Sequence, residues 1–247
     1  MFRLAATSVL GLCLAMPVAA QDVTEFSDIE RAQFRAEVRA YLMDNPEVIM
    51  EAIDVLRSRE AQEQAQSNVT LVSAHEADIF EDGYSFVGGN PEGDITLVEF
   101  LDYRCGYCKK AHGEVAKLLE TDGNIRLIVK EFPILGDDSV LASRFAIAVK
   151  QVVGDESYKA VSDAIMEMRG DVTMSALRRI AATFEIDADA VEARMDSEEV
   201  TAEIAKTREL AQKLQITGTP TFVMQDELLR GYLPYDQMKA LVSEKRG

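Results

Sequence analysis

The first stretch with a clear hydrophobic pattern, residues 22–66, spaces its apolar side chains at the three- to five-residue steps of one helix face. A second helix is predicted to begin at Asp44-Asn45-Pro46-Glu47, because proline is favoured at the first helical position. The two stripes are Phe26, Ile29, Phe34, Val38 and Tyr41 or Leu42, then Val48, Ile49, Ala52, Ile53 and Leu56. Residues 57–68 carry no large apolar side chain, which predicts a solvated helix or a linker.

The middle of the chain changes to runs that are typical of buried strands. Ile95–Leu101 and Ile125–Phe132 are apolar and rich in β-branched residues, and the segment from Cys105 to about Glu120 between them predicts a helix. Residues 74–80 indicate a short helix and residues 88–93 a cluster of turn formers. Strand, helix and strand with short connections predict a βαβ unit.

The last part of the chain is helical from residue 137 to 214 and then mixed. Capping residues predict helix starts near Asp138 or Ser139, Asp155, Thr173, Asp187 and Ser197. Beyond this block, Thr221–Met224 and Leu228–Tyr232 are predicted as strands and Tyr235–Lys245 as a helix. The chain therefore predicts an α/β protein with a thioredoxin-like fold, an inserted helical domain and an N-terminal helical arm. The predicted boundaries are 1–20 for a signal peptide, 21–70 for the arm and linker, 71–136 and 215–247 for the two halves of the thioredoxin-like domain, and 137–214 for the insertion.

The first twenty residues have the composition of a targeting segment. Arg3 gives a positive start, Leu4 to Met16 an apolar stretch and Val18-Ala19-Ala20 a small-residue cleavage site. The apolar stretch is shorter than the roughly 20 residues of a membrane span. Leu12 stands where a lipoprotein would need a small residue before Cys13. We therefore expect cleavage after Ala20 and an exported protein.

Cleavage would remove Cys13 and leave Cys105 and Cys108 as the remaining cysteines. One close pair in an exported chain is catalytic, metal-binding or a single small staple. Cys105 lies where the predicted strand turns into a helix, and a helix N-terminus stabilises a thiolate, so we expect Cys105 to be the exposed attacking thiol. Cys108 follows one turn later, and a modest distortion of the helix would let the two sulfurs form a disulfide.

The formal charge of −17 is strongly acidic, and it becomes −18 without Arg3. Such a charge argues against nucleic acid or an anionic membrane surface as a partner. It says little else about the chemistry.

Two further features stand near the dithiol in the predicted fold. Strand alternation puts Glu99 on the same face as Leu97 and Leu101, where desolvation would raise the pKa of its carboxyl. Such a group suits the transfer of the Cys108 proton, whereas Glu99 on an edge strand would lie in solvent. The Thr219-Pro220 bond is the other feature, although most X-Pro bonds are trans.

Together these residues resemble the DsbA-like periplasmic thiol:disulfide oxidoreductases. The resemblance rests on Val98-Glu99-Phe100 ahead of Cys105-Gly106-Tyr107-Cys108, on the helical insertion, and on Gly218-Thr219-Pro220-Thr221-Phe222. It implies that Cys105 is the nucleophile, Cys108 the resolving thiol, Glu99 the buried acid, and Pro220 a cis-proline facing the disulfide. Thr219, Pro220, Gly106 and Tyr107 would bind substrate. No cofactor is implied; the implied partners are exported proteins with cysteines and a membrane redox protein.

The chain departs from the DsbA oxidase pattern in the loop between the cysteines. Gly106-Tyr107 replaces the Pro-His of strong oxidases, and Thr219 replaces their usual Val. Both replacements resemble the DsbC-type isomerases. A less oxidising protein that isomerises or reduces disulfides is therefore expected, with a dithiol oxidase as the alternative. Asn45-Pro46-Glu47-Val48 resembles the oligomerising segment of ScsC-like members, which implies a homo-oligomer. An arm that folds back on the main domain is equally compatible with its periodicity.

Two other functions are less well supported by the sequence. Cys105, Cys108 and His112 form a C-x-x-C-x-x-x-H pattern of soft ligands that suits Cu(I) or Zn. His75 is the other histidine, so a closed four-ligand site is disfavoured and we expect no metal. His112 is then a helix-surface residue near the redox pair. An adaptor with vestigial thiols is opposed by the intact set of Glu99, Cys105, Cys108 and Pro220.

Overall fold

The computed structural model describes residues 27–247, and the predicted signal peptide and its cleavage site lie outside the described residues. The chain divides into two compact units, one ending at Ser58 and the other spanning Arg59–Gly247. Among residues 27–247, no helix combines the length and the apolar character that crossing a bilayer requires.

The described part of the first unit, from residue 27 on, is helical, as predicted. Helix α1 (Asp28–Asp44) begins with a capping box, in which Ser27 and Glu30 each accept a hydrogen bond from the backbone of the other. It ends ahead of Pro46, and α2 (Glu47–Ala74) follows, which confirms the predicted break. The stretch at 57–68 is continuous helix within α2. Large apolar side chains remain exposed in this unit: Ile29, Phe34, Val38, Tyr41, Met43, Ile49, Met50, Val55 and Leu56.

The second unit contains a five-stranded sheet with the order β1-β3-β2-β4-β5. Its strands are β1 (Phe86–Gly89), β2 (Ile95–Leu101), β3 (Ile125–Glu131), β4 (Thr221–Met224) and β5 (Glu227–Arg230). Strands β2 and β3 are parallel and the other neighbours are antiparallel. Since β2 lies at the centre, the alternative of Glu99 on an edge strand is wrong. The predicted thioredoxin-like fold is confirmed.

Strand β1 is missing from the sequence-based prediction, which placed turn formers at residues 88–93. Gly88 and Gly89 instead pair with Leu127 and Arg126 of β3. Gly89 has a φ of +66°, and a Cβ there would lie 2.4 Å from the carbonyl oxygen of Ile125. The glycines therefore permit a close backbone approach at the edge of the sheet. When only the sequence is known, the same glycines are typical of a turn.

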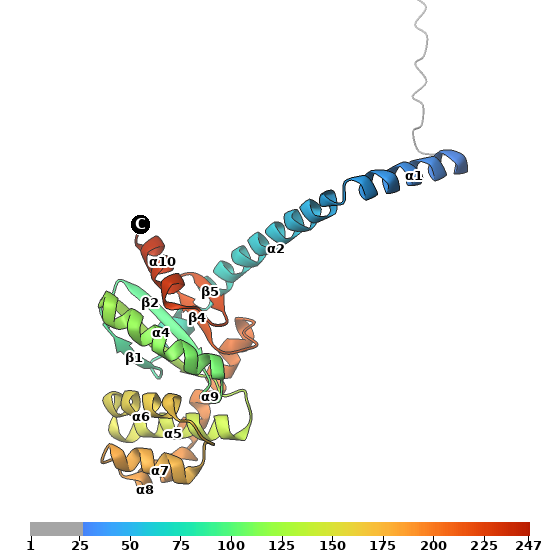
Figure 1. Cartoon of the computed structure of the whole chain (residues 1–247). Helices are drawn as coiled ribbons and strands as arrows, with labels where there is room; N and C mark the ends of the chain where they lie inside the picture. The colour runs from blue at the N-terminus through green and yellow to red at the C-terminus, as the bar shows by residue number, and fades with distance from the viewer. Residues whose placement is uncertain (1–26) are drawn as a thin grey trace, which may run out of the picture. The chain divides into compact units, whose positions relative to one another are not determined.

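The remaining helices start close to the predicted positions. They are α3 (Glu76–Phe80), α4 (Gly106–Asp122), α5 (Asp137–Val153), α6 (Asp155–Glu167), α7 (Met174–Thr183), α8 (Ala188–Met195), α9 (Glu198–Lys213) and α10 (Tyr235–Arg246). Thr173, Asp187 and Ser197 cap α7, α8 and α9 through their side chains, as their residue types predict. Figure 1 shows the inserted helices α5 to α8 gathered beyond one end of the sheet.

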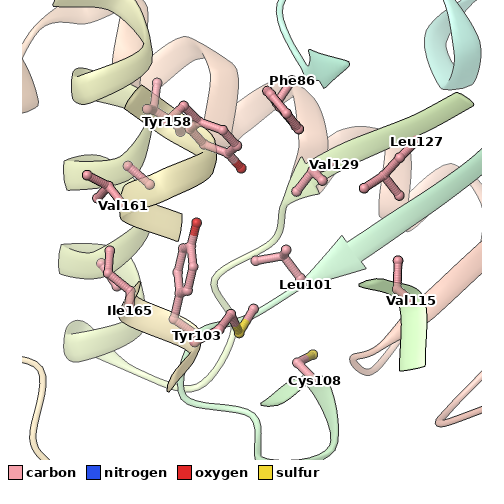
Figure 2. Packing of buried hydrophobic residues seen from close by; sticks show 14 of the residues in the cluster. Phe86, Leu101, Tyr103, Cys108, Val115, Leu127, Val129, Tyr158, Val161 and Ile165 are labelled. Atoms are coloured by element: carbon pink, nitrogen blue, oxygen red, sulfur yellow. The ribbon is translucent and has the colours of Figure 1, made fainter. Parts of the chain in front are cut away.

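Two apolar clusters cover the two faces of the sheet. Leu97 and Leu101 face α4, α6 and α10, and this cluster continues into the inserted helices. Val98 and Phe100 face the opposite way, toward the end of α2, α3 and α9. Figure 2 shows the first cluster, with Leu101 and Val129 from the sheet between Cys108 and Tyr158. The dithiol thus lies at the edge of a continuous core.

Candidate active site

Cys105 and Cys108 lie at the start of α4, directly beyond the central strand. Cys105 is the N-cap residue and Cys108 lies in the first turn, at 3.6 Å from Cys105. Both are free cysteines. Cys105 was expected to be exposed, but only 8% of the residue is exposed. It is still the more accessible of the two cysteines, because Cys108 is fully buried. The Thr219 carbonyl covers Cys105 and accepts a hydrogen bond from its Sγ at 3.1 Å.

The segment that carries this carbonyl comes from the far end of the sequence. Thr219-Pro220 is a cis peptide bond, as the family resemblance implied. The Gly231 N–H donates to the Pro220 carbonyl at 2.9 Å, and the Thr221 hydroxyl donates to the Gly218 carbonyl at 2.8 Å. The segment is therefore held on both sides of Pro220. It places a backbone carbonyl against the first cysteine.

Glu99 lies inside the core on the central strand. The residue is 4% exposed, and its Oε1 has no hydrogen-bond partner among the described residues. Burial raises the pKa of Glu99 to about 7, and the charge of Glu131 acts in the same direction. Burial also raises the pKa of the Cys108 thiol, with smaller contributions from Cys105 and Glu99. The thiol and the carboxyl are thus electrostatically coupled, and both favour their protonated forms.

Asp102 is a site residue that the sequence reasoning missed. Its buried carboxylate accepts hydrogen bonds from the backbone N–H groups of Arg104, Ile134 and Leu135 and from the Ser139 hydroxyl, all at 2.8 to 3.0 Å. Its carbonyl accepts from the Cys105 N–H at 3.0 Å. Asp102 therefore ties the loop before the dithiol to the loop after β3. An acid that directly ends an apolar strand was the available signal.

A second buried carboxylate, Glu131 at the end of β3, was also missed. The hydroxyls of Tyr103 and Tyr158 each donate to its Oε1 at 2.7 Å, and Ser143 donates to its Oε2 at 2.7 Å. Figure 2 shows the two tyrosine hydroxyls pointing toward one another. Burial raises the pKa of Glu131 to about 7 even though all three hydrogen bonds lower it. This network joins the sheet to α5 and α6.

The surface around the dithiol contains the other predicted substrate-binding residues. Gly106 is exposed, and a Cβ there would meet no atom within 4 Å, so the space above it is open. Tyr107 is 64% exposed, and its ring centroid lies 6.4 Å from that of Tyr232. Ile134 and Leu135, held by Asp102, are also exposed. Exposed apolar and aromatic side chains therefore lie at the start of α4 and on the loop that Asp102 joins to the dithiol loop.

His112 does not join the cysteines in a metal site. Its Nε2 lies 3.2 Å from Oδ1 of Asp163 on α6, and the side chain is 24% exposed. The described part of the chain holds no group of three His, Cys, Asp or Glu side chains placed to bind a metal ion. The geometry therefore counts against the copper or zinc hypothesis based on Cys105, Cys108 and His112.

Comparison with known proteins agrees with this geometry. Residues 96–243 match the DSBA-like thioredoxin domain family, and residues 30–63 match the family described as the copper resistance protein ScsC N-terminal domain. Disulfide bond formation protein D of Bacillus subtilis is 25% identical over 169 residues, which span 64% of this chain and 75% of that protein.

Two solved structures extend the likeness. A thioredoxin-like oxidoreductase from Silicibacter pomeroyi is 41% identical, with a TM-score of 0.65 over 69% of this chain and 96% of that one. Proteus mirabilis ScsC in a transitional conformation is 26% identical, with a TM-score of 0.65 over 89% of this chain and 98% of that one. The chain therefore belongs to the DSBA-like thioredoxin domain family and is a thiol:disulfide oxidoreductase.

Proposed function

We propose that this protein isomerises or reduces disulfides in exported, cysteine-containing proteins. The observation that carries the proposal is the convergence of three separate segments on one dithiol. Cys105 meets the Thr219 carbonyl beside cis-Pro220, and a buried carboxyl at Glu99 is coupled to Cys108. This arrangement supports Cys105 as nucleophile, Cys108 as resolving thiol and Glu99 as the acid that exchanges a proton with Cys108.

The chemical steps balance without a cofactor. The Cys105 thiolate attacks one sulfur of a substrate disulfide, the substrate S–S bond breaks, and the other substrate sulfur leaves as a thiolate. In isomerisation, a substrate thiolate then attacks the mixed disulfide and regenerates Cys105. In reduction, Cys108 passes its proton to the Glu99 carboxylate and attacks Cys105 Sγ. The Cys105–Cys108 disulfide forms and the reduced substrate leaves.

Substrate contacts are assigned to the residues around the Cys105 thiol. The Thr219–Pro220 segment offers backbone groups to an extended peptide beside the reacting sulfur. Gly106 leaves room above the dithiol and Tyr107 presents an exposed ring. Such a surface suits unfolded segments of varied sequence, because backbone and apolar contacts require no particular side chain.

The direction of exchange is inferred from the residues next to the cysteines. The loop residues Gly106 and Tyr107 offer no imidazole to stabilise a Cys105 thiolate. The reduced form of the protein is therefore stabilised less than the reduced form of a strong oxidase, which makes the dithiol less oxidising. A dithiol oxidase is the second candidate, favoured by the relative named disulfide bond formation protein D. A redox partner in the membrane would keep an isomerase reduced.

Location and assembly complete the proposal. Export to the periplasm is supported by the expected signal peptide and by the resemblance to the DsbA-like periplasmic enzymes. The match of residues 30–63 to the ScsC N-terminal domain and the exposed apolar side chains of α1 and α2 support a homo-oligomer formed through the arm. Several dithiols in one assembly would act on one substrate at high effective concentration, which favours isomerisation.

Cysteine variants test the proposed roles. With a scrambled disulfide protein as substrate, we expect Cys105→Ser to abolish refolding activity and to form no mixed disulfide. Cys108→Ser should accumulate a mixed disulfide at Cys105, detected by non-reducing electrophoresis and mass spectrometry. Two variants that refold the substrate as fast as the native protein would exclude the redox function.

Redox equilibrium separates the two candidate functions. Equilibration with glutathione buffers measures the reduction potential of the dithiol. We expect a value clearly more negative than that of a strongly oxidising DsbA, which is about −120 mV. A potential at that oxidising end would reject the isomerase assignment in favour of the oxidase.

A further inference from the structure

The contact between His112 and Asp163 fixes which ring nitrogen of His112 can accept a proton. Nε2 lies 3.2 Å from the Asp163 carboxylate, so the neutral imidazole carries its hydrogen on Nε2 and its lone pair on Nδ1. Lys159 forms an ion pair with the same carboxylate. Burial opposes ionisation of Asp163, but the hydrogen bonds from His112 and Lys159 outweigh it and lower the pKa. Asp163 is therefore a charged anchor for the ring.

A small cavity connects this surface pair to the buried carboxyl. It has a volume of about 30 Å³ and is lined by Glu99, His112, Lys159 and Asp163 among apolar neighbours such as Leu101 and Val115. One water needs roughly 10–15 Å³ of such space and two to four polar partners. Glu99, whose Oε1 has no partner among residues 27–247, and His112 both line the cavity. The cavity therefore has room for a water that could bridge Glu99 and His112.

We propose that His112, positioned by Asp163, carries protons between Glu99 and solvent through this cavity. The inference rests on the role proposed for Glu99. Before the resolution step, the protonated form of the Glu99 carboxyl gives its proton through the cavity to His112, and the imidazolium, which is 24% exposed, releases a proton to solvent. The Glu99 carboxylate formed in this way accepts the Cys108 proton when that thiol attacks the mixed disulfide. Without the relay, Glu99 that carries a proton cannot support the attack, so resolution is slowed.

The charges around Glu99 agree with a transfer in this direction. A positive charge on His112 lowers the pKa of Glu99, so the imidazolium and the Glu99 carboxylate stabilise one another. The charge of Glu131 instead raises the pKa of Glu99. Both oxygens of Glu131 already accept hydrogen bonds from Tyr103, Tyr158 and Ser143, so they are not free to receive the proton of Glu99. Among the described titratable groups, His112, Glu131 and Cys108 interact electrostatically with Glu99. Tyr158, Lys159 and Asp163 on α6 line the same cavity.

The test follows the resolution step alone. Reduced protein is mixed with glutathione disulfide, quenched with acid at short times, and analysed by mass spectrometry for the Cys105–glutathione adduct and the Cys105–Cys108 disulfide. We expect His112→Ala and His112→Gln to slow the loss of the adduct on the order of tenfold at neutral pH. Gln can still donate to Asp163 but cannot carry a proton. Added imidazole should restore the rate of the Ala variant. His75→Ala, which changes the histidine at the N-cap of α3, should match the native protein.

Glu99→Gln separates failure of the relay from failure of the Glu99 role. In the Glu99→Gln background, His112→Ala should slow resolution no further, because the two groups act in series. Slow resolution in Glu99→Gln with native rates in both His112 variants overturns the relay and leaves the role of Glu99 standing. Native rates in all variants overturn both. A slow Ala variant that imidazole does not restore also overturns the relay.

Discussion

Two buried glutamates on neighbouring strands have very different surroundings. Glu131 receives three hydroxyl hydrogen bonds, whereas Oε1 of Glu99 has none from the described residues. An unsatisfied buried oxygen costs about 1–3 kcal/mol, which apolar replacement would avoid. The carboxyl at Glu99 therefore reduces stability, and its electrostatic coupling to Cys108 agrees with a proton-transfer role.

This cost gives a pH-dependent prediction for Glu99→Gln. The pKa of Glu99 is about 7 in the folded protein and about 4.5 as a reference. Between these pH values the folded state binds a proton that the unfolded state has lost, so the free energy of unfolding falls as pH rises. Gln does not ionise, so the free energy of unfolding of Glu99→Gln does not fall for this reason as pH rises. We expect Glu99→Gln to match the native protein near pH 4.5 and to exceed it by about 2–3 kcal/mol at pH 8.

Denaturant unfolding of the reduced protein at both pH values measures this difference. Glu120→Gln removes the same charge from an exposed position on α4 and should show no pH-dependent difference. Glu131 contributes its own slope over the same pH window, which both proteins retain. An equal difference between Glu99→Gln and the native protein at the two pH values would contradict the raised pKa.

At the scale of elements, the start of α4 is positioned by loops more than by helix caps. Cys105 makes no side-chain capping hydrogen bond, and Asp102 joins the loop ahead of it to the loop that carries Ile134 and Leu135. The exposed apolar side chains beside the dithiol are therefore held by a single buried carboxylate.

Asp102→Asn tests this link with little change in shape. The amide can accept from Arg104 and Ser139 through its oxygen, but its NH₂ group would face the N–H groups of Ile134 and Leu135. We expect a loss of about 2–3 kcal/mol in unfolding free energy. Limited proteolysis should cut faster between residues 132 and 137. Asp138→Asn, which alters the partly exposed partner of Arg104, should change stability by under about 1 kcal/mol.

The Glu131 network links the sheet to the inserted helices at the same scale. Tyr158→Phe removes one of the two hydroxyls on Oε1 and keeps the ring against Phe86, whose centroid lies 4.8 Å away. We expect a loss of about 1–3 kcal/mol, as for a hydrogen bond to a buried polar or charged group. Chemical denaturation measures it. Tyr41→Phe, on the exposed face of α1, is the matched control and should leave the stability of the fold unchanged.

At the scale of the whole molecule, the proposed self-association of the arm would place one dithiol beside others. Helix α1 buries none of its side chains in the described chain, and Val38, Leu42, Met43 and Ile49 line an apolar hollow within the first unit. An uncovered apolar surface of this kind marks an interaction site. In the homo-oligomer proposed above, a second copy of the same helix would cover this surface.

Charged substitutions test self-association without removing the arm. We expect the native protein to show a multiple of the monomer mass by light scattering, and Val38→Glu with Ile49→Glu to show the monomer mass. Both side chains are exposed, so the dithiol unit should keep its fold and its glutathione reactivity. Gln62→Glu adds charge to a polar part of α2 as the control. A native protein that is already monomeric would refute the assembly.

The sequence determined what depends on local pattern. Strand alternation predicted that Glu99 is buried with Leu97 and Leu101, and capping residues predicted the starts of the inserted helices, because these follow from side-chain direction and backbone hydrogen bonding. The strand-to-helix junction predicted Cys105 at a helix N-terminus, and the structure shows it as the N-cap of α4. Pro46 predicted the break between α1 and α2.

Tertiary structure decided what depends on contacts between distant segments. Strand β1 is held by pairing with β3, and its glycines resemble a turn when read without that partner. The Thr219 carbonyl reaches Cys105 from the far end of the chain, and the roles of Asp102 and Glu131 depend on donors from later loops and helices. His112, a possible metal ligand by spacing, is instead held by Asp163, because packing of α6 on α4 brings a carboxylate to it. Hydrogen bonds of this range leave no periodic signal in the sequence, so only the folded chain reveals them.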